Sequence, residues 1–218
     1  MLPISQNLNL SPKNHKIAIL LLAAGGSSRM GVAKQLLPWG GTSMIGNAIN
    51  QTRSSNANEV LVVLGANFDD IEKDIASSKI SIIRNNEWKL GLGSSIACGI
   101  DYVKQQHPEI NAVLVMLADQ PLIDSKYLNL LIETYIIGKK GIVATKYTNK
   151  YGVPAIFSEF YFDMLGALNS DQGAKELIGS NTNDVQGLTI EKNTMDVDTM
   201  QDYEQASKLY MPDGGTTK

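Results

Sequence analysis

Apolar residues recur in two alternating patterns along the first half of the chain. Short runs rich in Val, Ile and Leu are typical of strands buried on both faces of a sheet. These runs are residues 17–24, 59–64 and 112–118. The segments between them have apolar positions at the spacing of an amphipathic helix. These segments are residues 43–53, 68–76 and 94–104. The alternation predicts βαβ units and a largely parallel sheet covered by helices on both faces.

The pattern is less regular after residue 119. It predicts a helix, two apolar extended segments, a short helix, a strand and a closing helix. Their positions are residues 125–135, 142–146, 153–157, 160–168, 184–191 and 199–209. We therefore expect a Rossmann-like, three-layer α/β/α fold with a mostly parallel mixed sheet. Ligands of such sheets bind beyond the carboxyl ends of the strands. Here, those ends include the loop after residue 24 and the carboxylate of Asp119.

Composition narrows the class of protein. A chain of 218 residues fits a single α/β domain. We expect that domain at residues 16–210, between a flexible leader (1–15) and a flexible tail (211–218). The net charge of −3 argues against nucleic acid or a membrane surface as a partner. A single cysteine, Cys98, excludes an internal disulfide and favours a reducing, cytoplasmic setting.

The first predicted strand runs into a glycine-rich segment, residues 22–34, with the sequence LAAGGSSRMGVAK. Gly25 and Gly26 allow backbone N–H groups to approach an anion, while Arg29 and Lys34 add positive charge suited to a triphosphate. No Gly-Lys-Ser/Thr sequence ends the loop, so it is not a Walker A motif. The glycine spacing also departs from the dinucleotide fingerprint. The alternative is a plain tight turn, and the two cations favour phosphate binding over it.

A carboxylate follows the apolar run at residues 112–118. Asp119 and the turn residue Pro121 lie where a buried strand ends, at the ligand-bearing edge of the predicted sheet. Mg²⁺ usually takes one or two protein carboxylates, with waters and substrate phosphates as its other ligands. We therefore predict that Asp119 is a metal ligand. The alternative is a turn residue that caps the helix near Ser125.

Residues 196–202, with the sequence DVDTMQD, hold the second acidic cluster. Asp198 suits an N-cap of the closing helix, and Thr199 is an alternative cap. From these residues alone, capping is the favoured role of Asp198.

Several segments resemble the MobA-like nucleotidyltransferases, and among them the molybdenum cofactor cytidylyltransferases. The resemblance runs from about residue 16 to residue 209. It rests on the opening LAAG, the RMG at residues 29–31, the lysine at position 34 and the LLP at residues 36–38. Relatives that transfer GMP more often open with LAGG, so Ala24 favours CTP over GTP.

The resemblance implies a nucleotidyltransferase fold and transfer of CMP from CTP to a molybdopterin that carries molybdenum, with release of pyrophosphate. It also implies Mg²⁺ as the cofactor and a client molybdoenzyme. Asp198 becomes the second metal ligand beside Asp119, and Arg29, Lys34 and Asp119 become the catalytic residues. The implied nucleotide-binding residues are Ala23, Ala24, Gly25, Gly26, Arg29, Lys34, Asn86 and Ser95.

The acceptor side is implied by two later segments that resemble the same family, YGVPAIF at residues 151–157 and DQGAK at residues 171–175. Ser170 stands where the family usually has glycine. A bulged strand and a capped helix are the alternative explanation. The residues carried over are Gly152, Pro154, Asp171 and Gly173.

Other functions stay open. A transferase of the same fold could use GTP, or could act on an isoprenoid or a sugar. A non-catalytic subunit could bind the nucleotide or the pterin without releasing pyrophosphate. A nicotinamide oxidoreductase is disfavoured, because no acidic residue follows the second predicted strand. His15 and His107 have no neighbour in the sequence that suggests a general base, and Cys98 is predicted to be a small core residue.

Overall fold

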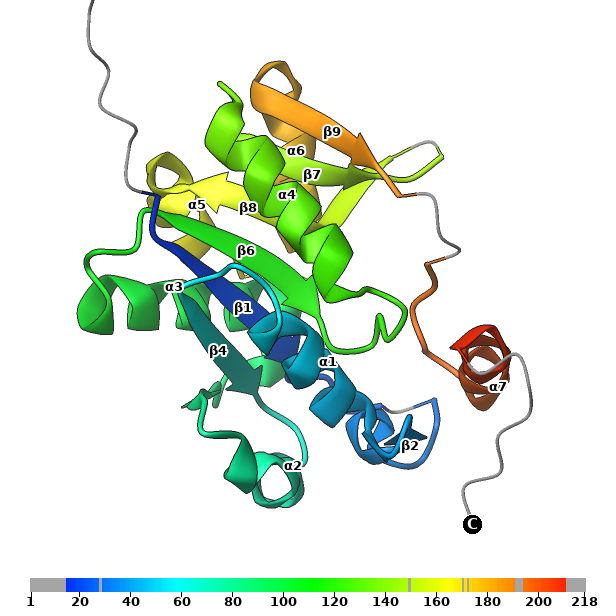
Figure 1. The fold of residues 1–218 in the computed structure, drawn as a ribbon. Coiled ribbons are helices and arrows are strands. Elements are labelled where there is room, and N and C mark those ends of the chain that lie inside the picture. The colour runs from blue at the N-terminus through cyan, green and yellow to red at the C-terminus, as the bar shows by residue number, and fades with distance from the viewer. Residues whose placement is uncertain are drawn as a thin grey trace, which may run out of the picture.

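A seven-stranded sheet forms the middle layer of the protein (Figure 1). The computed structural model describes residues 15–27, 29–148, 150–169, 171, 173–190 and 194–210. The strand order is β5-β4-β1-β6-β8-β7-β9. β8 is antiparallel to both of its neighbours and the other pairings are parallel, so the predicted mostly parallel mixed sheet is confirmed. The strands are β1 (Ile17–Ala23), β4 (Glu59–Leu64), β5 (Ser81–Arg84), β6 (Ala112–Leu117), β7 (Ile142–Lys146), β8 (Tyr151–Ser158) and β9 (Val185–Thr189).

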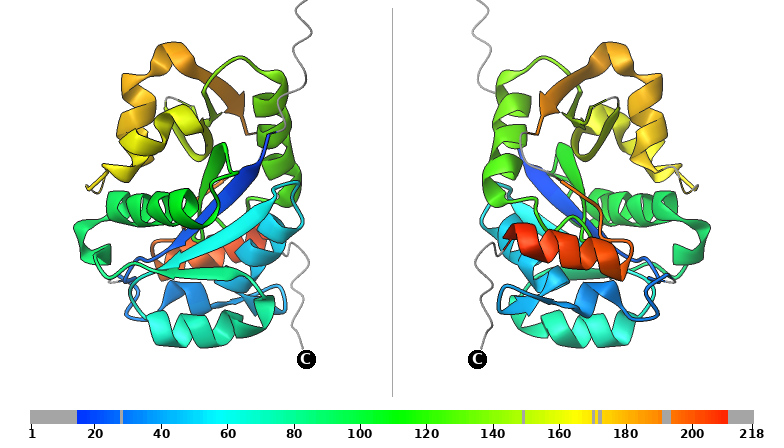
Figure 2. Two further views of the ribbon diagram at one scale, coloured as in Figure 1. Left: turned by 90° about the vertical axis from the view of Figure 1, so that its left-hand side faces the viewer. Right: turned by 90° about the vertical axis from the view of Figure 1, so that its right-hand side faces the viewer.

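Helices cover both faces of this sheet (Figure 2), which confirms the predicted three layers. One face packs against α1 (Met44–Arg53), α2 (Phe68–Ile75) and α4 (Ser125–Ile137). The other face packs against α3 (Leu92–Gln106), α5 (Phe162–Gly166) and α6 (Ala174–Ser180).

The central strand β1 explains why the sequence pattern was clear. Ile19 and Leu21 enter the core on one face of the sheet, whereas Leu20 and Leu22 enter the core on the other. Each of these side chains is at most 4% exposed. Because helices cover both faces, no position along the strand faces water, and the run is continuously apolar.

A smaller cluster lies beyond the main core. The hairpin of β2 (Pro38–Trp39) and β3 (Thr42–Ser43) packs against α7 (Met200–Tyr210), with Trp39, Val197 and Ala206 buried between them. The right-hand view of Figure 2 shows α7 in front of the sheet, on the side toward which β1 and β6 point. The sequence pattern missed this hairpin and β5, because such short strands are too brief to show a period.

Register explains how the two predicted ligand-bearing segments come together. Leu22 of β1 pairs with Leu117 of β6, and Ala118 N donates to Leu22 O at 3.0 Å. Ala24 and Asp119 therefore follow adjacent parallel strands at the same level. Both emerge at the carboxyl edge of the sheet, where ligands of such folds bind.

Residues 1–14 of the predicted leader and the predicted tail, 211–218, lie outside the described residues. His15 is described, and its ring packs edge-on against Tyr135 with centroids 5.2 Å apart. Within the described part of the chain, no helix has the length and apolar character needed to cross a membrane.

Candidate active site

The glycine-rich loop leaves β1 and turns back on itself before a short 3₁₀ helix (Lys34–Leu36). Met30 N donates to Ser27 O at 3.0 Å, and Lys34 N donates to Ser27 Oγ at 3.1 Å. Ser27 has a φ of 51° and Gly31 a φ of 67°, which is the left-handed conformation that lets a chain reverse direction tightly. This conformation of the loop returns the chain at Lys34 to the carboxyl end of β1.

Lys34 joins the loop to both acidic segments. Its ammonium donates to Asp119 Oδ2 at 2.7 Å, Asp198 Oδ1 at 3.1 Å and Val197 O at 2.9 Å. Its side chain is 12% exposed. Burial by itself lowers the pKa of Lys34, but attraction to Asp119 and Asp198 outweighs it and raises the pKa above its ordinary value. Lys34 therefore remains a cation at neutral pH.

Asp119 is the most enclosed carboxylate of this cluster. Its side chain is 21% exposed, against 42% for Asp198. Burial raises the pKa of Asp119, and the charges of Asp196 and Asp198 raise it further, while Lys34 opposes both effects. Arg29, which is exposed, pairs with Asp198 Oδ2 at 3.3 Å. Two cations and two carboxylates thus meet at the mouth of the glycine-rich loop.

In the structure, neither Asp119 nor Asp198 caps a helix with its side chain. Asp124 caps α4, accepting from Tyr127 N at 3.0 Å, so Asp119 does not cap that helix. Thr199 caps α7, because its hydroxyl accepts from Asp202 N at 3.2 Å. Asp202 reaches back to Thr199 N at 2.8 Å, which completes a capping box and leaves the Asp198 side chain with Lys34 and Arg29.

Thr199→Ala is expected to lower the free energy of unfolding by about 1 kcal/mol, because the first turn of α7 loses its cap. Urea denaturation measures this change. Gln205→Ala, at an exposed position of the same helix, is the control and should leave stability nearly unchanged. Equal stabilities of the two variants would show that the cap contributes nothing.

A cavity of about 430 Å³ opens beside this cluster. It is bounded by the glycine-rich loop, the start of α3 and the ends of β1 and β6. Several residues predicted from the sequence line it: Ala23, Ala24, Gly25, Gly26, Arg29, Lys34, Ser95, Asp119, Asp171 and Asp198. The aromatic ring of Trp88 also lines the cavity, close to Gly26.

The structure does not bring the other predicted residues to the cavity. Asn86 is exposed and absent from its lining, whereas the neighbouring Asn85 is buried and donates to Ser94 Oγ and Ser95 Oγ, each at 3.0 Å. Of the predicted acceptor-side residues, Gly152 and Pro154 lie within β8, away from this lining. Gly173 precedes α6 with a φ of +54°, and a side chain there would meet Leu92. Its role in the structure is therefore to allow the turn.

Sequence reasoning missed several lining residues, among them Gln35, Trp88, Lys89 and Leu92. Gln35 had a usable signal, since a polar residue beside Lys34 precedes the apolar pair 36–37. The other three residues belong to the short helix Trp88–Leu90 and the start of α3. Their proximity to the glycine-rich loop arises only when β4 and β1 pair.

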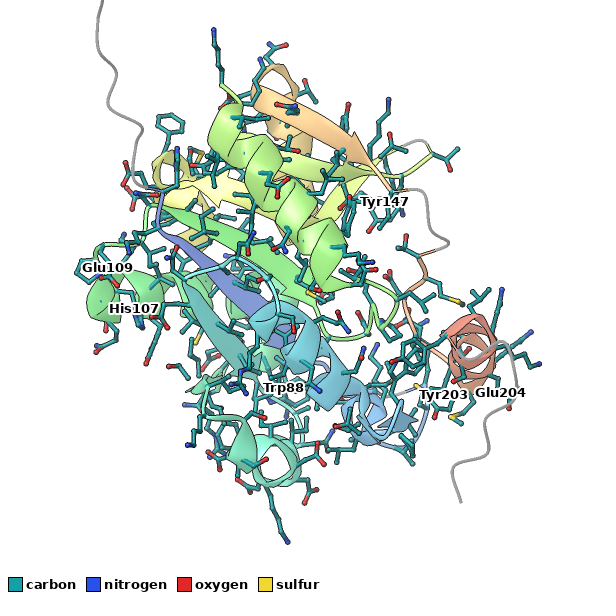
Figure 3. All side chains as sticks on the ribbon, viewed as in Figure 1. Trp88, His107, Glu109, Tyr147, Tyr203 and Glu204 are labelled. Carbon is teal, nitrogen blue, oxygen red and sulfur yellow. The ribbon has the colours of Figure 1, made fainter. Side chains whose placement is uncertain are left out.

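The residues that were not assigned to the site stay outside it. Figure 3 shows His107 and Glu109 together at the end of the molecule opposite Tyr203 of α7. His107 Nδ1 lies 3.6 Å from Glu109 Oε1. Cys98 is partly buried against the core, and burial raises the pKa of its thiol, which disfavours the reactive thiolate.

The two carboxylates fit a hard divalent cation. Asp119 Oδ1 is buried and has no hydrogen-bond partner among the described residues. Asp119 and Asp198 already converge on one positive charge, the Lys34 ammonium. The described residues contain no group of three or more His, Cys, Asp or Glu placed to hold a metal. The protein would thus supply two carboxylates, a number that suits Mg²⁺ when substrate phosphates provide further ligands.

The fold and the position of this cavity define the class of protein as a nucleotidyltransferase-type α/β domain. A sequence profile of the MobA-like NTP transferase domain matches residues 19–185. The chain belongs to that family, which is the one its motifs resemble.

The chain is similar in sequence to two known proteins along different shares of their length. The purine catabolism protein PucB of Bacillus subtilis is 25% identical over 200 residues, covering 87% of this chain and 95% of PucB. The bifunctional protein GlmU of Pseudomonas fluorescens is 27% identical over 138 residues, covering 62% of this chain but only 29% of GlmU.

Among solved structures, Rv0371c from Mycobacterium tuberculosis H37Rv has a TM-score of 0.78 and 26% identity, covering 89% of this chain and 98% of Rv0371c. A structure of Rv0371c in complex with manganese has a TM-score of 0.75 and 25% identity, covering 88% of this chain and 98% of that one.

Proposed function

We propose that this protein transfers CMP from CTP to the terminal phosphate of molybdopterin carrying molybdenum, and releases pyrophosphate. The observation that carries the proposal is the meeting of Arg29, Lys34, Asp119 and Asp198 beside a glycine-rich loop. Membership of a family of NTP transferase domains supports the reaction type. The choice of CTP rests on Ala24, and the choice of acceptor rests on the resemblance to the molybdenum cofactor cytidylyltransferases.

The proposed reaction is an in-line substitution at phosphorus. An oxygen of the acceptor's terminal phosphate attacks the α-phosphorus of CTP and forms a new P–O bond. The bond from that phosphorus to the bridging oxygen breaks, and pyrophosphate leaves with the electron pair. The nucleophile is already an anion, so the protein needs no strong general base. Catalysis then consists of positioning and charge neutralisation.

Each charged side chain has a distinct part in this proposal. Lys34 and Arg29 exchange their carboxylate partners for phosphate oxygens and neutralise the leaving pyrophosphate. Asp119 and Asp198 hold a divalent cation, Mg²⁺ in our proposal, which when bound offsets the charge of the triphosphate. The manganese complex of Rv0371c supports a divalent cation at a fold of this kind.

We assign the base and the acceptor to the remaining lining of the cavity. Ser95, in the first turn of α3, and Trp88, just before α3, line the cavity, and we assign the cytosine to these two residues. Asp171 lines the same cavity from the segment before α6, and we assign it to the acceptor side. The acceptor-side roles of Gly152, Pro154 and Gly173 and the nucleotide contact of Asn86 remain proposals from the resemblance. We further propose a cytoplasmic setting and a client molybdoenzyme that receives the product.

Pyrophosphate release from CTP, GTP, ATP and UTP, each with Mg²⁺ and with or without molybdopterin, tests the proposal. Release that is fastest with CTP and requires the pterin is the expected result. A preference for GTP would retain the chemistry and remove the role assigned to Ala24. Release that requires an isoprenoid or sugar phosphate would replace the acceptor. Binding of CTP without release under any of these conditions would support a non-catalytic subunit.

A further inference from the structure

Gln35 lies directly after Lys34 but faces the glycine-rich loop. The residue is 4% exposed. Its amide Nε2 donates to Ala23 O at 3.2 Å and to Gly25 O at 2.9 Å. Its Oε1 accepts from Ser27 Oγ at 3.3 Å. One buried amide thus spans the loop from its first residue to its turn.

These bonds occupy the acceptors of the loop. The carbonyls of Ala23 and Gly25 accept from Gln35, and the carbonyl of Ala24 accepts from Ala66 N at 3.0 Å. Three consecutive carbonyl oxygens, which would repel an anion, are therefore turned toward protein donors.

The peptide plane sets the direction of the donors. In a trans peptide the carbonyl of one residue and the N–H of the next point in opposite directions. Holding Ala24 O and Gly25 O in place therefore turns the N–H groups of Gly25 and Gly26 the other way. Both glycines line the cavity, and among the described residues neither N–H has an acceptor. Consecutive free N–H groups of this kind form an anion-binding concavity.

We propose that Gln35 is a positioning residue that holds the glycine-rich loop as a surface of N–H donors for the phosphates of the nucleotide. The inference rests on the proposed function, because it assigns the triphosphate to this loop. Gln35 acts through the peptide that joins Gly25 to Gly26, because it binds the carbonyl of Gly25. Its substitution therefore weakens the binding of any ligand whose phosphates lie there.

Calorimetric binding of CTP and of inorganic pyrophosphate, both with Mg²⁺, to the full chain tests this role. Gln35→Met fills the same space without hydrogen-bond donors, and it is expected to weaken the binding of both ligands about 10-fold. Ser95→Ala, in the first turn of α3, is the matched control. It should weaken the binding of CTP, because we assign Ser95 to the cytosine, while leaving the affinity for pyrophosphate unchanged.

A merely structural role gives a different result. If Gln35→Met lowers the melting temperature but binds both ligands as the wild type does, the inference is overturned. If that variant does not fold, Ser27→Ala removes one contact of the same amide at a partly exposed position. It should weaken the binding of pyrophosphate about 3-fold, and unchanged binding would also overturn the inference.

Wild-type protein that binds pyrophosphate but releases none from any nucleotide would overturn the proposed function and leave the role of Gln35 standing. Wild-type protein that binds no pyrophosphate would overturn the role of Gln35.

Discussion

Asp119→Asn is expected to lower the rate of pyrophosphate release by about 10³-fold or more. The substitution keeps the shape of the side chain and removes the buried charge that we assign to the metal. Lys34 keeps Asp198 and Val197 O as partners, so the loop is expected to stay in place. The loss should appear in kcat, with the affinity for CTP changed only slightly, because Arg29 and Lys34 remain.

Steady-state kinetics with CTP and the pterin acceptor measures this loss, and circular dichroism checks that the variant is folded. Asp163→Asn is the control, because Asp163 is a carboxylate at 2.7 Å from a lysine, Lys104, but on the surface. It should retain the wild-type rate. If Asp119→Asn also retained that rate, Asp119 would have no part in the chemistry.

Lys34→Met is expected to have the largest effect on stability, lowering the free energy of unfolding by about 3 kcal/mol. The reason is the carboxylate left behind. Asp119 Oδ1 already has no partner among the described residues, and Oδ2 would lose its bond of 2.7 Å to Lys34. A buried charge without a partner is costly, whereas the Met side chain itself fits the site. Pyrophosphate release should also fall steeply, because a phosphate-binding cation is lost.

Urea denaturation of Lys34→Met and Lys104→Met makes the comparison direct. Both lysines lie 2.7 Å from an aspartate, but Lys34 is 12% exposed and Lys104 is 48% exposed. The exposed pair is screened by water, so Lys104→Met should change stability little. Similar stabilities of the two variants would mean that the Lys34 pair contributes no more than a surface pair.

Added Mn²⁺ should then stabilise Lys34→Met more than the wild type, because a cation can take the place of the ammonium between Asp119 and Asp198. Thermal unfolding with and without Mn²⁺ measures this difference. An equal rise in melting temperature for both proteins would argue that the metal and Lys34 do not share these carboxylates.

The amino-acid sequence determined the parts of the fold that depend on local pattern. β4 and β7 were predicted with the bounds that the structure has, and β1 and β6 within one residue. Most residues of these strands are apolar and buried, and a glycine or a charged residue lies within two positions of an end of each strand. The glycine-rich loop could also be predicted from the sequence, because its small residues and its two cations lie together in one short segment.

The roles of the residues in the closing acidic segment could not be predicted from that segment alone. Asp198 and Thr199 both suit an N-cap by residue type. The structure assigns the cap to Thr199 and Asp202, which leaves Asp198 to pair with Lys34 and Arg29. The resemblance singled out Asn86, but in the structure Asn86 is exposed, and the neighbouring Asn85 is buried and contacts Ser95.

The tertiary structure alone decided how the charges meet. Lys34 is 85 positions from Asp119 and 164 positions from Asp198 along the chain. No local pattern predicts these contacts between distant residues. They follow from the pairing of β1 with β6 and from the packing of α7 against the β2–β3 hairpin. The sequence by itself determined which residues carry charge at the ends of strands and turns. The packing of distant elements determined which of those charges share one cavity. That packing encloses Asp119, and burial raises the pKa of Asp119. It also places Asp119 and Asp198 beside Lys34, and their attraction raises the pKa of Lys34 in spite of its burial.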